Sequence, residues 1–288
     1  MHTRRHIPWL YLAPVLIILG FFLVYPSIET LYLSFLDRDS QEFVGLENYI
    51  YAFTDESMVM AFRNNAIWLI CFTFLSLSIG LTLAVLLDRV RYEQVVKTII
   101  FLPMAVSMVG AGVIWKFIYS YRPPGTAQIG LLNAILDYLG CEPVGWLIQT
   151  PYNNLFIIFV GVWIWTGFCM VVFSADYKSI PKQLLESARL DGASEWQTFW
   201  KIVLPLMKPT LAVVATTMIV FVLKIFDFVY LMTNGNFDTE VIANRMYKMF
   251  QYPDFGKAGT LAVILLLLVI PLMLINIRRF RREGKVSK

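Results

Sequence analysis

Six long apolar runs constrain the fold of this chain more strongly than any other feature of its sequence. A helix needs about 20 mainly apolar residues to cross the hydrocarbon core of a bilayer, and each run reaches that length. Only 15% of the residues are charged, whereas about a quarter are charged in a typical soluble domain. The sequence therefore predicts an all-α, polytopic membrane protein with about six transmembrane helices. The predicted spans are residues 9–35, 65–87, 98–119, 155–175, 205–231 and 258–277.

The positions of the basic residues indicate how these helices are oriented. Lysine and arginine are concentrated near both chain ends and after the second and fourth runs, and they are sparse in the other loops. Cytoplasmic segments of membrane proteins carry such an excess, so both ends are predicted to be cytoplasmic. The first run is too long for a removed signal peptide and lacks a small-x-small cleavage site. The predicted organisation is a cytoplasmic tail at 1–8, a transmembrane domain at 9–277 with a polar loop at 178–205, and a basic cytoplasmic tail at 278–288.

The chain lacks the short motifs that mark nucleotide-binding proteins and hydrolases. It contains no G-x-x-x-x-G-K-[ST], H-E-x-x-H or G-x-S-x-G, which are signatures of a P-loop, a zinc hydrolase and a serine hydrolase. Its three cysteines form no C-x-x-C, and its two histidines lie in the basic N-terminal tail, so no disulfide framework or zinc site is indicated. We therefore expect a transport unit that is not an enzyme and has no cofactor of its own.

The polar stretch between the fourth and fifth runs has the signals of two short helices joined by a turn. Ser179 and Pro181 are typical residues for a helix start, and Gly192 suits the left-handed residue that ends a helix. Ser194, followed three residues later by Gln197, predicts a capping box and a second helix. The stretch is thus predicted to be a helix, a tight turn and a helix that leads into the fifth run.

Three aromatic residues share one face of the second short helix, namely Trp196, Phe199 and Trp200. Such a face could lie in the headgroup region of the membrane, or it could anchor the loop in the cleft of a partner protein. We expect a third arrangement for the two tryptophans, in which they brace the loop against the helical bundle while the turn at Asp191-Gly192 meets the partner.

The spacing within this stretch resembles a family signature. Residues E-A-A, then three residues, Gly, nine residues and I-x-L-P mark the EAA loop of binding-protein-dependent ABC importer permeases, and this chain differs only in Ser for the middle Ala. The segments FVGLENY (43–49), KTIIFLPMAV (97–106) and FDFVYLMTNGNFDTEV (226–241) resemble the carbohydrate branch of that family, the maltose-permease type. The last of these, with QIGLLN (128–133) and INIRRFRR (275–282), is most similar to α-glucoside and glucosylglycerol permeases.

The resemblance implies a bacterial or archaeal inner-membrane protein with several partners. These are a dimer of a cytoplasmic ABC ATPase that binds ATP and Mg, a second homologous permease subunit and an extracytoplasmic solute-binding protein, with lipid around the spans. The short helix of the loop would sit in a groove of the ATPase and transmit its closure to the spans. The implied coupling residues are Glu186, Ser187, Ala188, Asp191, Gly192, Ile202, Leu204 and Pro205.

The fifth run carries two charged residues, Lys224 and Asp227. Charged side chains inside a span are costly and are functional candidates by default. At a spacing of three they would be neighbours on one helix, so they could neutralise each other, or Asp227 could accept hydrogen bonds from sugar hydroxyls.

Sugar contacts in the maltose-type relatives fall in the spans before and after the EAA loop. Trp165, Phe168 and Phe221 could stack on sugar rings, although packing between helices is the alternative for each. The matching positions here, with Lys224, make up the predicted substrate pathway: Gly161, Ile164, Trp165, Phe168, Met218, Phe221, Val222 and Asp227.

The favoured function is therefore the permease subunit of an ATP-driven importer for an α-glucoside-type oligosaccharide or a glucosyl osmolyte, working by alternating access. A permease of the same family for another solute, such as glycerol phosphate, is the main alternative and predicts a basic cluster in the pathway. A secondary transporter would need its own ion-coupling residues, and an anchor or receptor would transport nothing.

Overall fold

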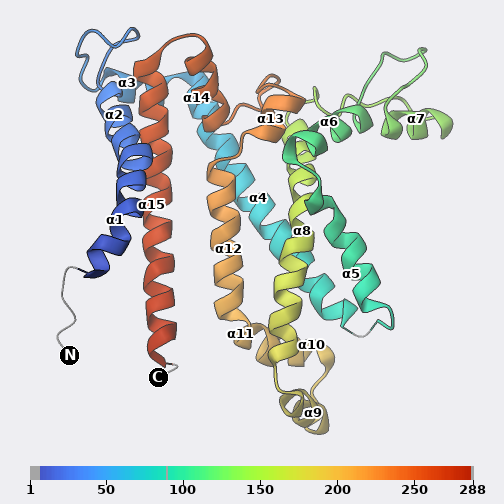
Figure 1. The fold of residues 1–288 in the computed structure, drawn as a ribbon. Helices are drawn as coiled ribbons and strands as arrows, with labels where there is room; N and C mark the ends of the chain where they lie inside the picture. The colour runs from blue at the N-terminus through green and yellow to red at the C-terminus, as the bar shows by residue number, and fades with distance from the viewer. Residues whose placement is uncertain (1–6, 89, 287–288) are drawn as a thin grey trace.

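A computed structural model describes residues 7–88 and 90–286. These residues form helices and loops, and the only strand-like feature among them is a single antiparallel bridge between Leu36 and Phe43. Long helices run side by side between two ends of the molecule (Figure 1). Residues 1–6 and 287–288, which belong to the two predicted tails, lie outside the described residues.

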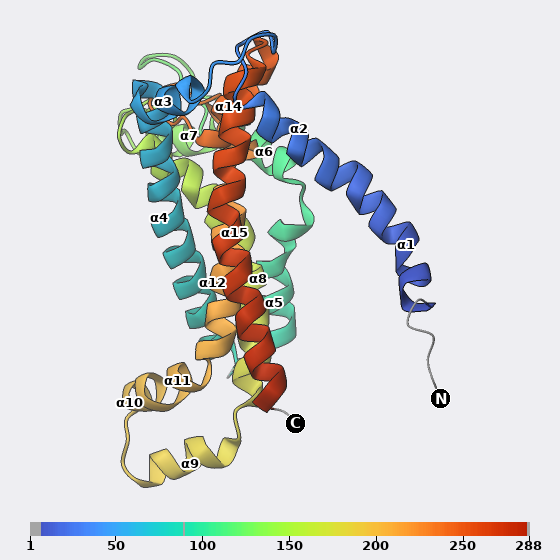
Figure 2. The same cartoon turned by 90° about the vertical axis from the view of Figure 1, so that its left-hand side faces the viewer.

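The first predicted span forms an arm of three consecutive helical segments: α1 (Ile7–Leu19), the π-helical η1 (Gly20–Val24) and α2 (Tyr25–Leu33). Its apolar stretch Trp9–Leu33 is long enough to cross a membrane and is not buried within this chain. Helix α2 packs against α15 (Phe255–Val286), whereas α1 leans away from the other helices (Figure 2). The arm therefore presents its apolar side chains to lipid or to another protein.

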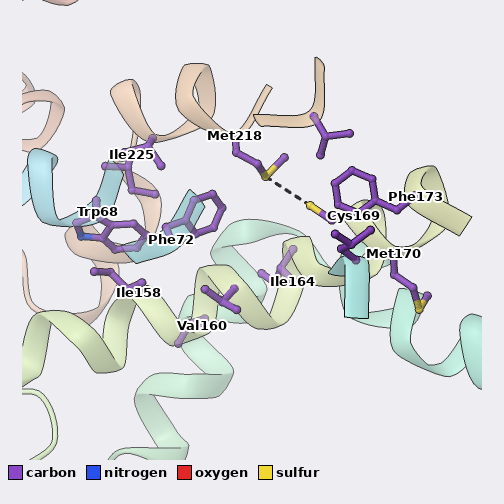
Figure 3. Close-up of a cluster of buried hydrophobic side chains, with 14 of the residues drawn as sticks. Trp68, Phe72, Ile158, Val160, Ile164, Cys169, Met170, Phe173, Met218 and Ile225 are labelled. Carbon is purple, nitrogen blue, oxygen red and sulfur yellow. Dashed lines mark hydrogen bonds between the residues drawn. The ribbon is translucent and has the colours of Figure 1, made fainter. Parts of the chain in front are cut away.

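Helices α4 (Glu56–Leu87) and α8 (Asn153–Ser179) form the centre of the bundle. Asp55 begins α4 by accepting hydrogen bonds from the backbone N–H groups of Ser57 and Met58, which satisfies donors that a helix start leaves free. Gly161 lets the two helices approach, because a Cβ there would lie 3.1 Å from the ring of Phe72. The buried side chains of this core are apolar and aromatic (Figure 3).

The third predicted span is formed by a bent pair of helices and not by one straight helix. It consists of α5 (Glu93–Phe101), the 3₁₀ turn η2 (Leu102–Ala105) and α6 (Met108–Ile118), with an angle of 97° at the break. Pro103 has no backbone N–H to continue α5, and Ser107 starts α6 by accepting a hydrogen bond from the N–H of Gly110. Helix α6 consequently turns to lie across one end of the bundle (Figure 1).

The fifth predicted span is also interrupted. Its described helices are α11 (Leu204–Leu206), α12 (Lys208–Leu223) and α13 (Asp227–Met232), and the segment before Met207 meets α12 at 70°. The span predicted over 205–231 is therefore interrupted near both of its ends and does not form one helix.

Helix α15 continues to Val286 and so extends into the segment predicted as a basic tail. The start of α1 and the end of α15 lie toward the same end of the bundle as the polar loop after α8, while α3 (Glu47–Thr54), α7 (Leu131–Tyr138) and α14 (Ile242–Gln251) lie at the opposite end (Figure 1). By length and composition the described residues contain three spanning helices, or five if each bent pair counts as one span. The shorter apolar helix Phe255–Pro271 lies at the position of the sixth predicted span.

Candidate coupling loop and substrate pathway

The polar loop folds as two short helices, α9 (Lys182–Leu190) and α10 (Glu195–Thr198). Pro181 is the N-cap of α9, whereas Ser179, expected to start this helix, is the last residue of α8. Gly192 ends α9 with a φ of +79°, and the N–H of Ala193 donates to the carbonyl of Ala188 at 2.9 Å. These two features form the left-handed cap for which glycine is favoured.

The second helix begins with the predicted capping box. The hydroxyl of Ser194 accepts from the N–H of Gln197 at 3.2 Å, and the side chain of Gln197 accepts from the N–H of Ser194 at 2.9 Å. An ion pair of 3.2 Å between Arg189 and Glu195 joins the two helices across the turn. The helix–turn–helix predicted from the sequence is thus present, and this ion pair connects its two helices.

The residues predicted to couple with an ATPase divide by exposure. Glu186, Ser187, Asp191 and Gly192 are exposed, and Ala188 is buried against the rest of the loop. Their neighbour Leu190 is 88% exposed. The remaining predicted positions lead into α12, with Ile202 and Leu204 half-buried and Pro205 exposed.

The two tryptophans of the loop do not brace it as expected. Trp196 is 70% exposed and Trp200 is 49% exposed. Their rings contact each other, with centroids 5.5 Å apart, while Phe199 is the aromatic side chain of this face that packs against the hydrophobic core. Phe199 therefore anchors the loop to the bundle, and the indole rings of Trp196 and Trp200 remain exposed to a partner or to the membrane interface.

Three aromatic side chains of the predicted pathway meet about halfway along α8. The ring centroids of Trp165 and Phe221 are 4.7 Å apart, and those of Trp165 and Phe168 are 5.7 Å apart in an edge-to-face arrangement. The indole N–H of Trp165 is buried and has no hydrogen-bond partner among the described residues. An aromatic face can pack against a sugar ring, and an indole N–H can donate to one of its hydroxyls.

The other pathway positions have packing roles in this conformation. Ile164, Met218 and Val222 are buried in the core, and the sulfur atoms of Met218 and Cys169 are 3.9 Å apart (Figure 3). Gly161 accommodates the rings of Trp68 and Phe72.

The two charged residues of the fifth span do not lie together on one helix. Lys224 is the C-cap of α12, and Asp227 is the first residue of α13. No ion pair joins them among the residues that the structure describes. Lys224 instead lines a groove of about 500 Å³ against α14 and α15, whose other lining residues are Phe226, Ala243, Met246, Tyr247, Ala262, Leu265, Leu266 and Val269. This groove is suited to lipid or helix packing rather than to a sugar.

Two aromatic residues of α4 belong to the cluster and were not predicted from the sequence. Phe72 contacts Phe221 at 5.3 Å between centroids, and Trp68 contacts Phe72 at 6.1 Å. Their spacing of four residues within an apolar run places them on one helix face. This spacing is the sequence feature from which they could have been predicted. Across 7–88 and 90–286, no three His, Cys, Asp or Glu side chains are grouped to hold a metal ion.

Spanning helices, an aromatic cluster halfway along them and an exposed helical loop at one end together define a membrane transport subunit. A family model described as the binding-protein-dependent transport system inner membrane component matches residues 76–280, and the chain belongs to this family. The resemblance seen in the loop and the predicted all-α polytopic fold are thereby confirmed.

Known relatives align with nearly the whole length of this chain. It is 55% identical to the osmoprotective compounds uptake permease protein GgtC of Synechocystis, covering 96% of this chain and 100% of the relative. It is 47% identical to the α-glucoside transport system permease protein AglF of Rhizobium meliloti, covering 96% and 83%. A bacterial ABC transporter involved in the import of the polysaccharide alginate has a chain with a TM-score of 0.80 and 25% identity, covering 95% of this chain and 94% of that one. The predicted closer similarity to α-glucoside and osmolyte permeases is confirmed, and the protein is an inner-membrane transport subunit rather than an enzyme.

Proposed function

We propose that this permease carries an α-glucoside-type oligosaccharide or a glucosyl osmolyte into the cytoplasm, driven by a separate ATPase. The observation that carries the proposal is the cluster of Trp165, Phe168 and Phe221, which offers ring faces and an unpaired indole N–H in the middle of the bundle. Two similar permeases, one named for the uptake of osmoprotective compounds and one for α-glucoside transport, support this class of substrate.

Coupling to the ATPase is proposed to occur at α9 and the turn after it. Glu186, Asp191 and Leu190 project from this loop into open surroundings, and Gly192 holds the turn that presents them. A cytoplasmic ATPase dimer would bind ATP and Mg, close around these helices and shift the spans between two states. The ATPase must bind the two states with different affinity for ATP to drive transport.

A second, homologous permease and an extracytoplasmic solute-binding protein complete the proposed importer. The first apolar arm, which has no buried residues in its apolar stretch, and the lipid-suited groove beside Lys224 are surfaces that the second permease would cover. The cytoplasmic location of both chain ends follows from the charge distribution and is part of the proposal.

A permease for an anionic solute such as glycerol phosphate is the second candidate. It would need cationic side chains at the aromatic cluster. Lys224 lies against α14 and α15 instead, while Phe221 turns toward α4 and α8, so the geometry favours a neutral sugar.

Reconstitution of the complete importer in proteoliposomes tests the proposal. We expect glucosylglycerol, sucrose, trehalose or maltose, presented with the binding protein, to stimulate ATP hydrolysis and to accumulate inside. Glycerol 3-phosphate should do neither. Stimulation by glycerol 3-phosphate alone would refute the sugar assignment, and accumulation without the ATPase would refute the importer.

A further inference from the structure

The segment that joins the α9–α10 loop to α12 lies close to the plane of the membrane. Residues Glu195–Leu206 meet α12 at a bend of 70°. Spanning helices are tilted from the membrane normal by about 20° on average, so a helix bent this far from a span runs nearer to the membrane plane than to the normal. Figure 2 shows α10 and α11 between the ends of the long helices and α9. The segment therefore lies where the surface of the bilayer meets the spans.

Two indole rings are exposed along this segment. Trp196 and Trp200 contact each other and are exposed, as is Leu206 at the end of the segment. Phe199, which lies between the two tryptophans, packs against the hydrophobic core and so fixes how the segment is turned about its axis. Tryptophan is enriched at the membrane–water interface, because its ring is apolar while its N–H can bond to water or headgroups.

Trp196 lies on the side of the segment that faces α4. With Phe199 it lines a groove of about 290 Å³ against Thr82, Val85 and Leu86, which belong to the last two turns of α4. Helix α4 is long and apolar enough to cross a membrane, and Thr82 and Leu86 are exposed on its surface. The indole is thus placed beside the end of a membrane-crossing helix, whereas α9 stands farther from the bundle (Figure 2).

The charges beside the rings are suited to phospholipid headgroups. Glu195 is the only acidic residue of 195–208, and it pairs with Arg189 at 3.2 Å. Lys201 and Lys208 are exposed, and neither forms an ion pair within residues 7–88 and 90–286. A lysine near an apolar face can lay its methylene stem along that face and place its ammonium group beside a lipid phosphate. Aromatic rings with basic residues beside them are typical of helices that lie in the membrane interface.

We propose that Glu195–Leu206 is an interfacial segment that binds phospholipid, with Trp196 and Trp200 in the headgroup region of the leaflet on the side of the loop. The partner of these rings is then lipid, and the ATPase needs to contact only α9 and the turn at Gly192. Lipid bound to the segment holds the start of α12 at a fixed depth in the membrane. The inference does not depend on which solute is transported.

Spin labels on the complete importer in proteoliposomes test this placement. Cys141 is the exposed one of the three cysteines, so Cys141→Ser provides the background for labelled variants, and its residual signal is subtracted. A label at Trp196→Cys or Trp200→Cys is then measured by its collision rates with oxygen, which concentrates in lipid, and with a neutral nickel complex, which stays in water. We expect the oxygen-to-nickel ratio at both positions to be at least about threefold higher than at Leu190→Cys on α9.

A label at Leu206→Cys keeps both rings in place, so it tests the segment even if a tryptophan variant fails to assemble. Trp196→Ser combined with Trp200→Ser should lower the oxygen-to-nickel ratio at Leu206→Cys about threefold, because serine removes the apolar area that lies in the interface. Trp196→Tyr combined with Trp200→Tyr should preserve the ratio, because tyrosine also favours the interface.

Three results would overturn the lipid assignment. Ratios at the tryptophan positions equal to that at Leu190→Cys would place the rings in water. Labels shielded from both oxygen and nickel would mean that protein covers the rings, either the ATPase or the second permease. An unchanged ratio at Leu206→Cys in the serine double variant would show that the rings do not hold the segment at the membrane. All ratios are measured without solute or ATP, so a failure of sugar transport would refute the proposed function and leave these results readable.

Discussion

The turn at Gly192 gives the most direct test of how the permease receives energy. Its φ of +79° lies in the left-handed region, and a Cβ at this position would meet no atom within 4 Å. In Gly192→Ala the free-energy cost at this residue therefore comes from backbone conformation alone. An L-residue pays about 1–2 kcal/mol to remain left-handed, which corresponds to about a 5- to 30-fold loss in the population of the native turn.

The structure shows what this population change does to α9. The hydrogen bonds from the N–H groups of Gly192 and Ala193 to the carbonyls of Arg189 and Ala188 depend on the left-handed residue. If the ATPase binds only the native turn, its affinity falls by the same factor. Gly192→Asn should restore most of the affinity, because Asn tolerates this conformation better than Ala.

The chain contains a matched control at the end of the bundle opposite the α9–α10 loop (Figure 1). Gly140 follows α7 with a φ of +74°, and a Cβ there would meet no atom within 4 Å. The N–H groups of Gly140 and Cys141 donate to the carbonyls of Asp137 and Leu136, the same pattern that Gly192 and Ala193 make after α9. Gly140→Ala thus imposes the same strain away from the ATPase.

The assay for both variants is co-purification of the ATPase at graded concentrations, followed by sugar-stimulated ATP hydrolysis in proteoliposomes. We expect Gly192→Ala to lose about 5- to 30-fold in ATPase affinity and Gly140→Ala to match the unmodified chain. Equal losses in the two variants, or no loss in either, would refute the assignment of this turn to coupling.

Two further changes test the pathway and the outer loop. Trp165→Phe should raise the KM for sugar about fivefold by removing one donor, whereas Trp146→Phe, whose indole N–H is also buried and unpaired, should leave KM unchanged; equal effects on transport would assign both rings to packing. Lys248→Met should destabilise the protein by about 2 kcal/mol in thermal unfolding, because it leaves the buried carboxylate of Glu240 without the ammonium group 2.7 Å away. Adding Glu240→Gln should recover most of that loss, and a further loss instead would contradict the ion-pair argument.

Local signals in the sequence were sufficient for the coupling loop. The capping box at Ser194 and the left-handed turn at Gly192 both follow from interactions between residues a few positions apart, and both are present. The failures at Ser179 and at the two tryptophans have a common cause. Whether α8 continues through Ser179, and whether Trp196 or Phe199 meets the bundle, depends on how the loop sits against distant helices.

The broken spans show the limit of apolar length as a signal. The predicted apolar runs continue on both sides of Pro103 and of Lys224. Nevertheless, α5 ends shortly before Pro103, and α12 ends just before Lys224. Proline explains one break from the sequence alone. At the other, Phe226 stacks on Tyr230 and meets Tyr247 on α14, a contact across elements that no local pattern contains.

The arrangement of α8 and α12 links the two parts of the proposed mechanism. The coupling loop begins at the end of α8 and, through α11, leads into α12, so any movement of α9 acts on both helices at once. The same helices carry Trp165 and Phe221, whose ring centroids lie 4.7 Å apart. A rigid-body displacement of α12 relative to α8 must separate this pair or slide one ring past the other, because packed side chains do not deform continuously. In the proposed mechanism, movement of the α9–α10 loop therefore opens or closes the path for a sugar ring at this aromatic pair.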